Sequence, residues 1–539
     1  MWTAANLIIE GRLQSVHHCL RPVAVECTYW CLATKVCLRP YVSRLHELLQ
    51  PSQVGVSIPQ GFKAAVHATR SFMAQTPSEK VLLKLDTKNA FNSICQGLQA
   101  AQTHLPETYP FIWGCYSSKT SLFRGEFCLD SGNGVQQRDP LGLTLFSPRH
   151  WWSYIQGQIK PKCFVPWWWV YWWRPSDCAQ QCCQRQEWTI LIWSRKNSKC
   201  ELLIVNHTTS QERSQTTKLF QDEFPTISTP ALNIWQLLGS PLHQKSVPLH
   251  LEAKTKVLDN IFENLELIQP HEAFFVLINC LSISKLIFTA KCTMLQVQRG
   301  TGGVWHCHKN QDGKICNVSW SRKLVTSILP IIHAGLGFCS AADLSLTCFL
   351  PLSHACKGLV NRLLSFVNLE LPYGNVNDAS DTWSKHHDSS PLQKGIQAVW
   401  VDLACKDSLN TLLNTKNPWN HCRLLTAQES HTTPWSEAFP ITNIGNLISP
   451  DKLRIAITLW IGAKIFESTK CRCGKSVDEL GSMASPVLKM QAFPRHSAIN
   501  SILKRSLTCS NLPSTLELVG LTNDGRRPDG LTLSPGPYA

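Results

Sequence analysis

Two groups of cysteine and histidine residues have the types and spacing of metal ligands. Cys471 and Cys473 are one residue apart, and His496 follows further along the chain. Structural zinc takes four sulfur or nitrogen ligands, and this group supplies three. Two interpretations stay open, an incomplete zinc site or two free thiols, and we favour free thiols. The second group, residues 306–308 (HCH) with Cys316, is explained equally well as a polar loop.

Asp86 is a carboxylate at the end of a short apolar run. Residues 81–86 (VLLKLD) have the composition of a buried strand, so the acid is expected at the strand tip. Carboxylate oxygens are the ligands that hard divalent cations prefer. The alternative is a strand-end carboxylate that only caps the following helix.

A stretch without acids follows downstream. No Asp or Glu lies between Asp139 and Asp177, while seven of the 20 tryptophans lie between Trp151 and Trp173. No adjacent Asp-Asp pair occurs anywhere in the chain. A WWWVYWW run fits neither the helical nor the strand period. It is either a buried aromatic cluster or a damaged sequence, and we expect residues 147–190 to be irregular.

The elements that would position these residues alternate between strands and helices as far as about residue 145. We expect strands at 21–30 and 81–86, a hairpin around 124–126, and helices at 32–49, 61–73 and 91–102.

Helical patterns dominate the rest of the chain. A helical stretch is expected over 251–286, with Leu258, Ile261, Leu265 and Ile268 on one face, and further helices over 341–369 and 392–467. A loop is expected over 300–320. The predicted divisions are 1–245, 246–370, a polar linker at 371–391, 392–470 and 471–539.

Composition limits the class of protein. The 539 residues carry 52 Lys and Arg against 37 Asp and Glu, a net charge of +15, and 43% are hydrophobic. This excludes wholesale disorder and favours a polyanionic partner. The longest apolar run, Phe164–Trp173, is shorter than the roughly 20 residues of a membrane helix. We expect no secretory signal and no membrane partner, so the 24 cysteines are predicted to be reduced.

Three segments in order carry the strongest motif signal. They are KLDTKNAFNSI (84–94), SGNGVQQRDPLG (131–142), and WSRKNSKCEL with LLGSPL (193–202 and 237–242). Together they resemble the reverse transcriptase of non-LTR (LINE-type) retrotransposons. The segments RPVAVECT, LQPSQVGVSIPQGFKAAVHATR, HAGLGFCSA and LRIAITLWIGAKI resemble further parts of that family in the same order. The final CRCG, RHSAIN and GRRPDGLTL resemble the start of the restriction-like endonuclease in one branch.

The resemblance implies an α/β or α+β fold, with a right-hand polymerase palm and fingers over 1–245 and a mainly helical thumb and C-terminal region after it. It implies an RNA-directed DNA polymerase that uses an RNA template, a DNA primer and two Mg²⁺ ions, in the nucleus or cytoplasm.

The resemblance also assigns roles to single residues. Asp86 is the first of three metal-binding carboxylates, Phe91 the aromatic gate, Gln137 a contact of the incoming nucleotide, Lys199 a residue near its phosphates, and Arg21 a nucleotide or template contact. The alternatives without a functional role are an ordinary core aromatic for Phe91 and a solvated surface lysine for Lys199. Asp529 resembles the first acid of the nuclease site, and the sequence ends ten residues later, so we expect no nuclease activity.

Departures from the family pattern indicate that catalysis is lost. The family's aromatic-x-Asp-Asp hairpin falls in the PWWWVYWW run, and Arg138 replaces the glycine of the Gln-Gly-Asp-Pro turn. The codons for residues 481–487 are compatible with the family's His-Cys motif in a neighbouring frame. We infer one frameshift at these residues and another at the tryptophan run. The prediction is an inactive polymerase. The alternatives are a non-catalytic nucleic-acid-binding remnant and a translated pseudogene.

Overall fold

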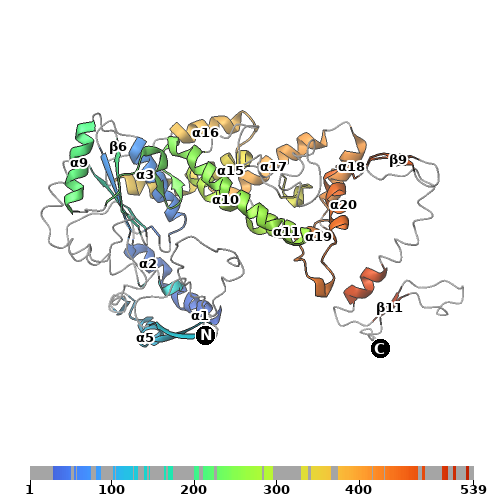
Figure 1. Ribbon diagram of the computed structural model, residues 1–539, viewed down its shortest axis with the longest axis horizontal. Helices are drawn as coiled ribbons and strands as arrows, with labels where there is room; N and C mark the ends of the chain where they lie inside the picture. The colour runs from blue at the N-terminus through green and yellow to red at the C-terminus, as the bar shows by residue number, and fades with distance from the viewer. Residues whose placement is uncertain are drawn as a thin grey trace. The chain divides into compact units, whose positions relative to one another are not determined.

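The structure is a computed structural model of the chain. It describes residues 28–49, 54–55, 58–74, 80–86, 101–102, 105–124, 127–131, 139–142, 145, 163–165, 168–173, 200–205, 210–223, 227–281, 284–294, 329–337, 341–365, 374–414, 417–429, 431–465, 467–470, 476–479, 500–507, 514–516 and 530–532. Helices predominate among these residues, and the sheets are small and antiparallel (Figure 1). The expected mixture of helices and strands is confirmed, and the pairing fits the α+β class. The described elements do not by themselves identify a polymerase palm or fingers.

The helices are α1 (Thr28–Leu38), η1 (Arg39–Tyr41), α2 (Val42–Leu49), α3 (Gly61–Ala74), α5 (Tyr109–Tyr116), α9 (Ser210–Glu223), η3 (Leu232–Ile234), η4 (Gln244–Ser246), α10 (Val247–Leu265), α11 (Pro270–Val276), the π-helix η5 (Leu277–Leu281), α12 (Ser284–Cys292), η6 (Ile331–His333), α15 (Ala341–Ser365), α16 (Gly374–Ser384), α17 (Gln397–Leu413), α18 (Pro418–Ala427), α19 (Pro434–Glu437), η7 (Thr442–Ile444) and α20 (Pro450–Ile461).

The strands are β1 (Lys80–Asp86), β2 (Thr120–Arg124), β3 (Phe127–Ser131), β4 (Cys163–Val165), β5 (Trp168–Trp173), β6 (Glu201–Val205), β7 (Gln236–Leu237), β8 (Ser240–Pro241), β9 (Thr469–Lys470), β10 (Ser476–Val477), β11 (Ser514–Leu516) and β12 (Gly530–Thr532). The chain divides into two compact units. The first is Met1–Lys254, Leu286–Val297 and Ala342–Leu403, and the second is Thr255–Lys285, Gln298–Ala341 and Ala404–Ala539.

A four-stranded antiparallel sheet of the first unit has the order β4-β5-β1-β6. β1 is one of its two inner strands, and Val81, Leu82 and Leu83 are fully buried, as expected for an apolar run covered on both faces. The predicted strand with Asp86 at its end is confirmed.

The core of the first unit forms where α3 and α15 pack with this sheet (Figure 1). Ala64 and Phe72 of α3, Leu82 of β1, Leu203 of β6 and Val360 of α15 belong to one buried cluster. α3 is rich in alanine and starts at Gly61, where a Cβ atom would lie 1.7 Å from the backbone oxygen of Val54. Only glycine allows the helix to start so close to another backbone segment. The predicted helix at 61–73 is confirmed.

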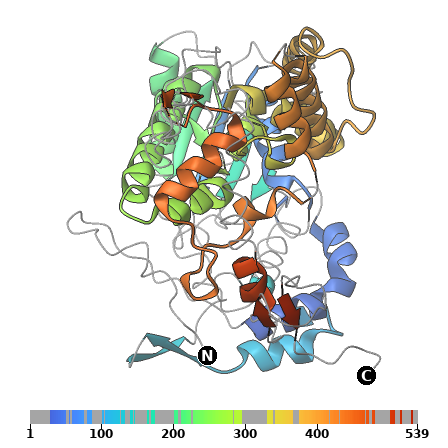
Figure 2. The same cartoon turned by 90° about the vertical axis from the view of Figure 1, so that its right-hand side faces the viewer.

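A second, smaller core surrounds α5 and contains Leu38, Ile112, Cys115 and Leu141. The predicted hairpin follows α5 and is confirmed, with Arg124 opposite Phe127 in the β2–β3 pair (Figure 2).

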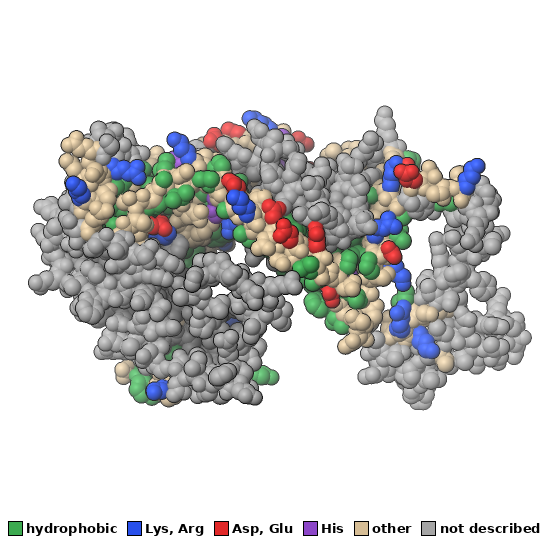
Figure 3. All heavy atoms as spheres, viewed as in Figure 1, with side chains coloured by type: hydrophobic (Ala, Val, Ile, Leu, Met, Phe, Trp, Pro, Cys, Tyr) green, Lys and Arg blue, Asp and Glu red, His purple; other side chains and the backbone are tan. Residues whose placement is uncertain are grey.

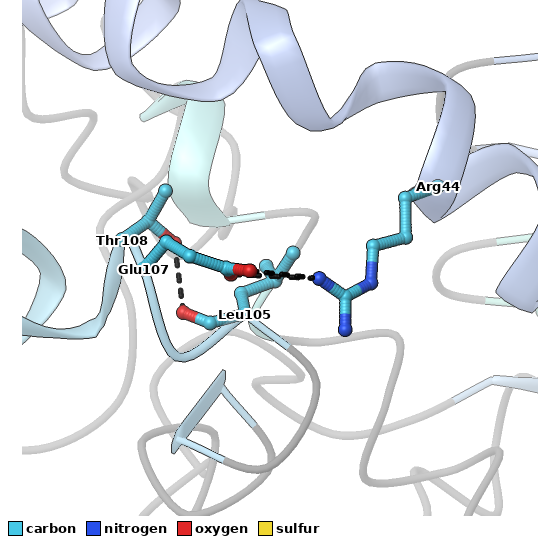
Figure 4. A network of polar contacts seen from close by, with 4 residues as sticks. All are labelled: Arg44, Leu105, Glu107 and Thr108. Atoms are coloured by element: carbon cyan, nitrogen blue, oxygen red, sulfur yellow. Dashed lines mark hydrogen bonds and ion pairs between the residues drawn. The ribbon is translucent and has the colours of Figure 1, made fainter.

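One exposed ion pair joins α2 to the turn before α5. The Nη1 atom of Arg44 lies 3.2 Å from Oε1 of Glu107, and the Thr108 hydroxyl donates to the Leu105 carbonyl at 3.1 Å (Figure 4). Because both charged side chains are about half exposed, this pair contributes little, on the order of 0–1 kcal/mol.

The predicted linker at 371–391 is wrong in its local structure, because it contains α16. Trp383 near the end of this helix is 1% exposed, and its ring packs edge-on against Trp400 at a centroid distance of 4.7 Å. Its indole N–H donates to the Ser389 carbonyl at 2.9 Å. Val376, Ala379 and Trp383 recur at helical spacing, and the burial of Ala379 and Trp383 holds this mostly polar segment as a helix.

Three further expectations need correction. The strand expected at 21–30 is wrong over its last residues, since Thr28–Trp30 begin α1; the helix formers after them override local strand preference. Ile268 is 42% exposed because α10 ends at Leu265. The tryptophan run is not irregular throughout, since Trp168–Trp173 form β5.

The second unit is mainly helical over its described residues between 404 and 465, as expected, with turns and loops between α18, α19 and α20. Its interior contains an aromatic cluster in which Trp435 stacks with Phe274 and meets Trp460 edge-on. The Trp460 indole donates to the Gly335 carbonyl at 2.7 Å. No helix of the described residues combines the length and apolar character needed to cross a bilayer.

Candidate functional site

The candidate site starts from Asp86, which ends β1. In the antiparallel pair of β1 and β5, Asp86 lies opposite Trp168, the first residue of β5. Two residues separate β5 from β4, so a hairpin lies beside the end of β1 that carries Asp86. Strands β4 and β5 read CFV and WWVYWW and contribute no carboxylate.

The strand on the other side of β1 contributes one acid, Glu201 at the start of β6. Glu201 pairs in register with Lys84, and the Lys84 ammonium lies 3.0 Å from its carboxylate. The Lys84 side chain is 8% exposed, so a buried cation holds this carboxylate. Glu201 therefore neutralises Lys84 and is a poor ligand for an added ion, because leaving Lys84 unpaired would cost several kcal/mol, about 3–5.

Asp139 is the other described acid of the predicted motifs. It is 3% exposed, and its Oδ1 atom accepts from the backbone N–H of Leu141 at 2.9 Å. Its Oδ2 atom accepts from the hydroxyl of Tyr116. Both oxygens are thus committed to holding the turn at Pro140 against α5, which is a structural role.

The two-ion site that the resemblance implies does not fit the described residues. Two divalent cations about 3.5–4 Å apart need several carboxylates converging on one point. Among the described residues no three His, Cys, Asp or Glu side chains group together. Asp86 has no acidic partner on β4 or β5, and Glu201 is paired with Lys84.

Most of the predicted site residues lie outside the described residues. They are Arg21, Phe91, Gln137, Lys199, Cys471, Cys473, His496 and Asp529, together with Arg138, Asp177 and the 306–308 and Cys316 group. Their roles, including zinc binding, stay predictions. Lys84 pairs with Glu201 in the antiparallel ladder of β1 and β6. Asp86 comes two residues after Lys84 in the sequence, and Lys199 comes two residues before Glu201.

A polar cluster that the sequence analysis missed lies where α3 meets α12. The His67 Nε2–H donates to the Lys291 carbonyl at 3.0 Å. Arg70 Nη1 donates to the Pro241 carbonyl at 2.9 Å and lies 3.0 Å from the Thr293 hydroxyl. His67 and Arg70 are three residues apart on one helical face, which the sequence does show, but no local pattern indicates partners more than 170 residues away.

Burial shifts the pKa values of the ionisable side chains in and next to this cluster. Burial lowers the pKa of His67 to about 4, and the nearby Arg70 charge acts in the same direction. Burial also lowers the pKa of Arg70. Cys292 of α12 and Cys356 of α15 are buried thiols whose pKa burial raises to about 12, so they stay protonated near neutral pH.

Comparison with models of known protein families gives no match for this chain, and comparison with curated protein sequences gives none either.

Proposed function

We propose that this chain derives from the reverse transcriptase of a non-LTR retrotransposon and binds RNA and primer–template without extending the primer. The hairpin beside Asp86 is the observation that carries the proposal.

In the enzymes that the sequence resembles, two further carboxylates come from an aromatic-x-Asp-Asp hairpin. The resemblance therefore requires a hairpin next to the strand that ends in Asp86. β4 and β5 form such a hairpin, β5 pairs with β1, and Trp168 faces Asp86 in the register. A hairpin made of the acid-free tryptophan run therefore lies where the resemblance expects one. This combination supports both the derivation and the loss of catalysis.

Without these carboxylates the chain lacks the ligands that nucleotidyl transfer needs for its two metal ions. In two-metal nucleotidyl transfer one ion activates the attacking oxygen and the other neutralises the leaving pyrophosphate. Mg²⁺ requires near-octahedral oxygen ligands, and a single protein carboxylate does not fix two such ions in register. Residues of one catalytic unit act together, so loss of part of the unit removes most of the rate.

Binding does not need these carboxylates. Phosphate contacts from Lys and Arg supply most of the non-specific affinity for nucleic acid, and the chain has a net charge of +15. We therefore propose RNA and primer–template as partners through phosphate contacts.

Primer extension tests the catalytic half. The full chain, incubated with a DNA primer on an RNA template and Mg²⁺ or Mn²⁺, is expected to give no extension, and Asp86→Ala should behave identically. Extension by the unaltered chain that disappears in Asp86→Ala would show that other acids complete the site.

Filter binding tests the other half. Affinity for RNA should fall by roughly 0.7 log units per log unit of salt for each phosphate contacted by a protein cation. Absence of binding at low salt would leave the translated-pseudogene alternative. An aromatic-x-Asp-Asp codon string in the neighbouring frame near codon 167 of the genomic DNA would support that alternative directly.

A further inference from the structure

Four cations gather around α3, and none of them has an acidic partner among the residues that the structure describes. Lys63 and Arg70 lie two turns apart on α3, Lys245 lies in η4, and Lys291 lies in the last turn of α12. We call these four residues the α3–α12 basic patch. All of them belong to the first compact unit.

Several interactions bring the four residues together. The hydrogen bond from His67 to the Lys291 carbonyl joins the end of α12 to α3. Arg70 is bonded to the Pro241 carbonyl and lies within hydrogen-bond distance of the Thr293 hydroxyl, which places it between β8 and the end of α12. Burial lowers the pKa of His243, and the charges of Lys245 and Arg70 act in the same direction, so both cations lie near this imidazole.

The charges of the patch repel one another. Burial lowers the pKa of Lys63, and Lys291 lies close enough for its charge to act in the same direction. No described Asp or Glu forms an ion pair with any of the four cations, whose recorded partners are an amide, a carbonyl and a hydroxyl. Lys63 donates to the side-chain amide oxygen of Gln60 at 2.6 Å, which leaves its charge uncompensated.

Such an arrangement is stabilised by an anion from outside the protein. Each phosphate that approaches relieves the repulsion between neighbouring cations and releases condensed counterions from the nucleic acid. The three lysines are half-buried or exposed and remain accessible, while Arg70 is held by the fold. The cations come from three separate elements, which fits a strand of phosphates better than a membrane plane, where one amphipathic helix is the usual device.

We propose that the α3–α12 basic patch contacts the sugar–phosphate backbone of bound RNA, with Lys63, Lys245 and Lys291 as the phosphate contacts and Arg70 as the residue that fixes their spacing. This inference rests on the proposed function and names the surface that carries it. By contrast, α10 carries several acidic side chains along its length, which disfavour phosphate (Figure 3).

The test compares two triple variants of the full chain that lose the same charge. The first is Lys63→Gln, Lys245→Gln and Lys291→Gln. The control is Lys218→Gln, Lys385→Gln and Lys394→Gln, at exposed positions of the same unit outside the patch. Fluorescence anisotropy with a labelled single-stranded RNA gives the slope of log Kd against log salt. The patch variant should lower that slope by about 2, from three contacts of roughly 0.7 each. The control should lower it much less.

Hydrogen–deuterium exchange supplies a second readout that does not depend on any variant folding. RNA should slow exchange in peptides that cover 61–74 and 284–294 of the unaltered chain. Equal slopes for the two triple variants, or RNA binding without protection of these peptides, would overturn the patch while leaving the proposed function standing. Absence of RNA binding by the unaltered chain would overturn both. Binding to phosphatidylserine vesicles but not to RNA would assign the patch to membranes and refute the proposal.

Discussion

Acidification should weaken the first unit through one buried imidazole, His67. Its side chain is buried between α3 and α12, its Nε2–H donates to the Lys291 carbonyl, and its ring lies 5.6 Å from that of Phe349. The charged side chain that acts on this imidazole is Arg70, one turn further along α3. Protonation would add a second positive charge beside Arg70 in a buried site.

The size of the effect follows from linkage. Burial lowers the pKa of His67 from 6.5 to about 4, so the unfolded chain binds this proton first as the pH falls. The stabilising contribution is complete above pH 6.5 and is lost progressively as the pH falls toward 4. From about pH 8 to about pH 5 the loss is about 2 kcal/mol, from 1.36 kcal/mol for each pKa unit. Burial lowers the pKa of His250 to about 4 as well, and its contribution adds to the total.

The variant His67→Gln isolates the contribution of one imidazole. A glutamine amide can donate to the Lys291 carbonyl and does not titrate. We expect the loss of unfolding free energy between the two pH values to be smaller in this variant by about 2 kcal/mol. Urea midpoints should be read from pulsed hydrogen exchange of peptides within 61–74, since a chain of two units does not unfold in a single step.

A matched control is Phe72→Leu, which removes packing in the same helix without removing a titratable group. It should lower stability equally at both pH values. If His67→Gln loses as much stability on acidification as the unaltered chain, the imidazole is already protonated in the folded state or lies in water, and the reasoning fails.

Three further predictions concern stability and are measured by urea midpoints. Trp383→Ala should lower the free energy of unfolding, read from peptides that cover 374–384, by about 3–5 kcal/mol, and Trp383→Phe should lower it much less. An equal loss in both variants would show that the indole N–H rather than packing anchors α16. Gly462→Ala should cost more than about 1 kcal/mol, because φ is +71° and a Cβ atom would lie 2.8 Å from Nε of Arg423; an unchanged midpoint would contradict this geometry. Glu201→Leu should cost about 3–5 kcal/mol by leaving the buried Lys84 ammonium unpaired, and adding Lys84→Met should restore most of it; additive losses would show that the pair is not coupled.

Local sequence patterns predicted the elements that depend on neighbouring residues. The apolar run at 81–86 gave β1 with Asp86 at its end, the alanine-rich stretch at 61–73 gave α3, and the turn around Gly125 gave the β2–β3 hairpin. These succeed because backbone preference and periodicity act over a few residues.

Tertiary structure decided the features that depend on distant residues. α16 forms in a mostly polar segment, because the burial of Ala379 and Trp383 outweighs weak local preference. Asp139 is occupied by the Tyr116 hydroxyl and the Leu141 N–H, which its motif does not show. The α3–α12 basic patch joins Lys63 to Lys245 and Lys291 across about 200 residues of chain. Charges so far apart in sequence meet only when packing of the core brings α3, η4 and α12 together, and no local period records that meeting.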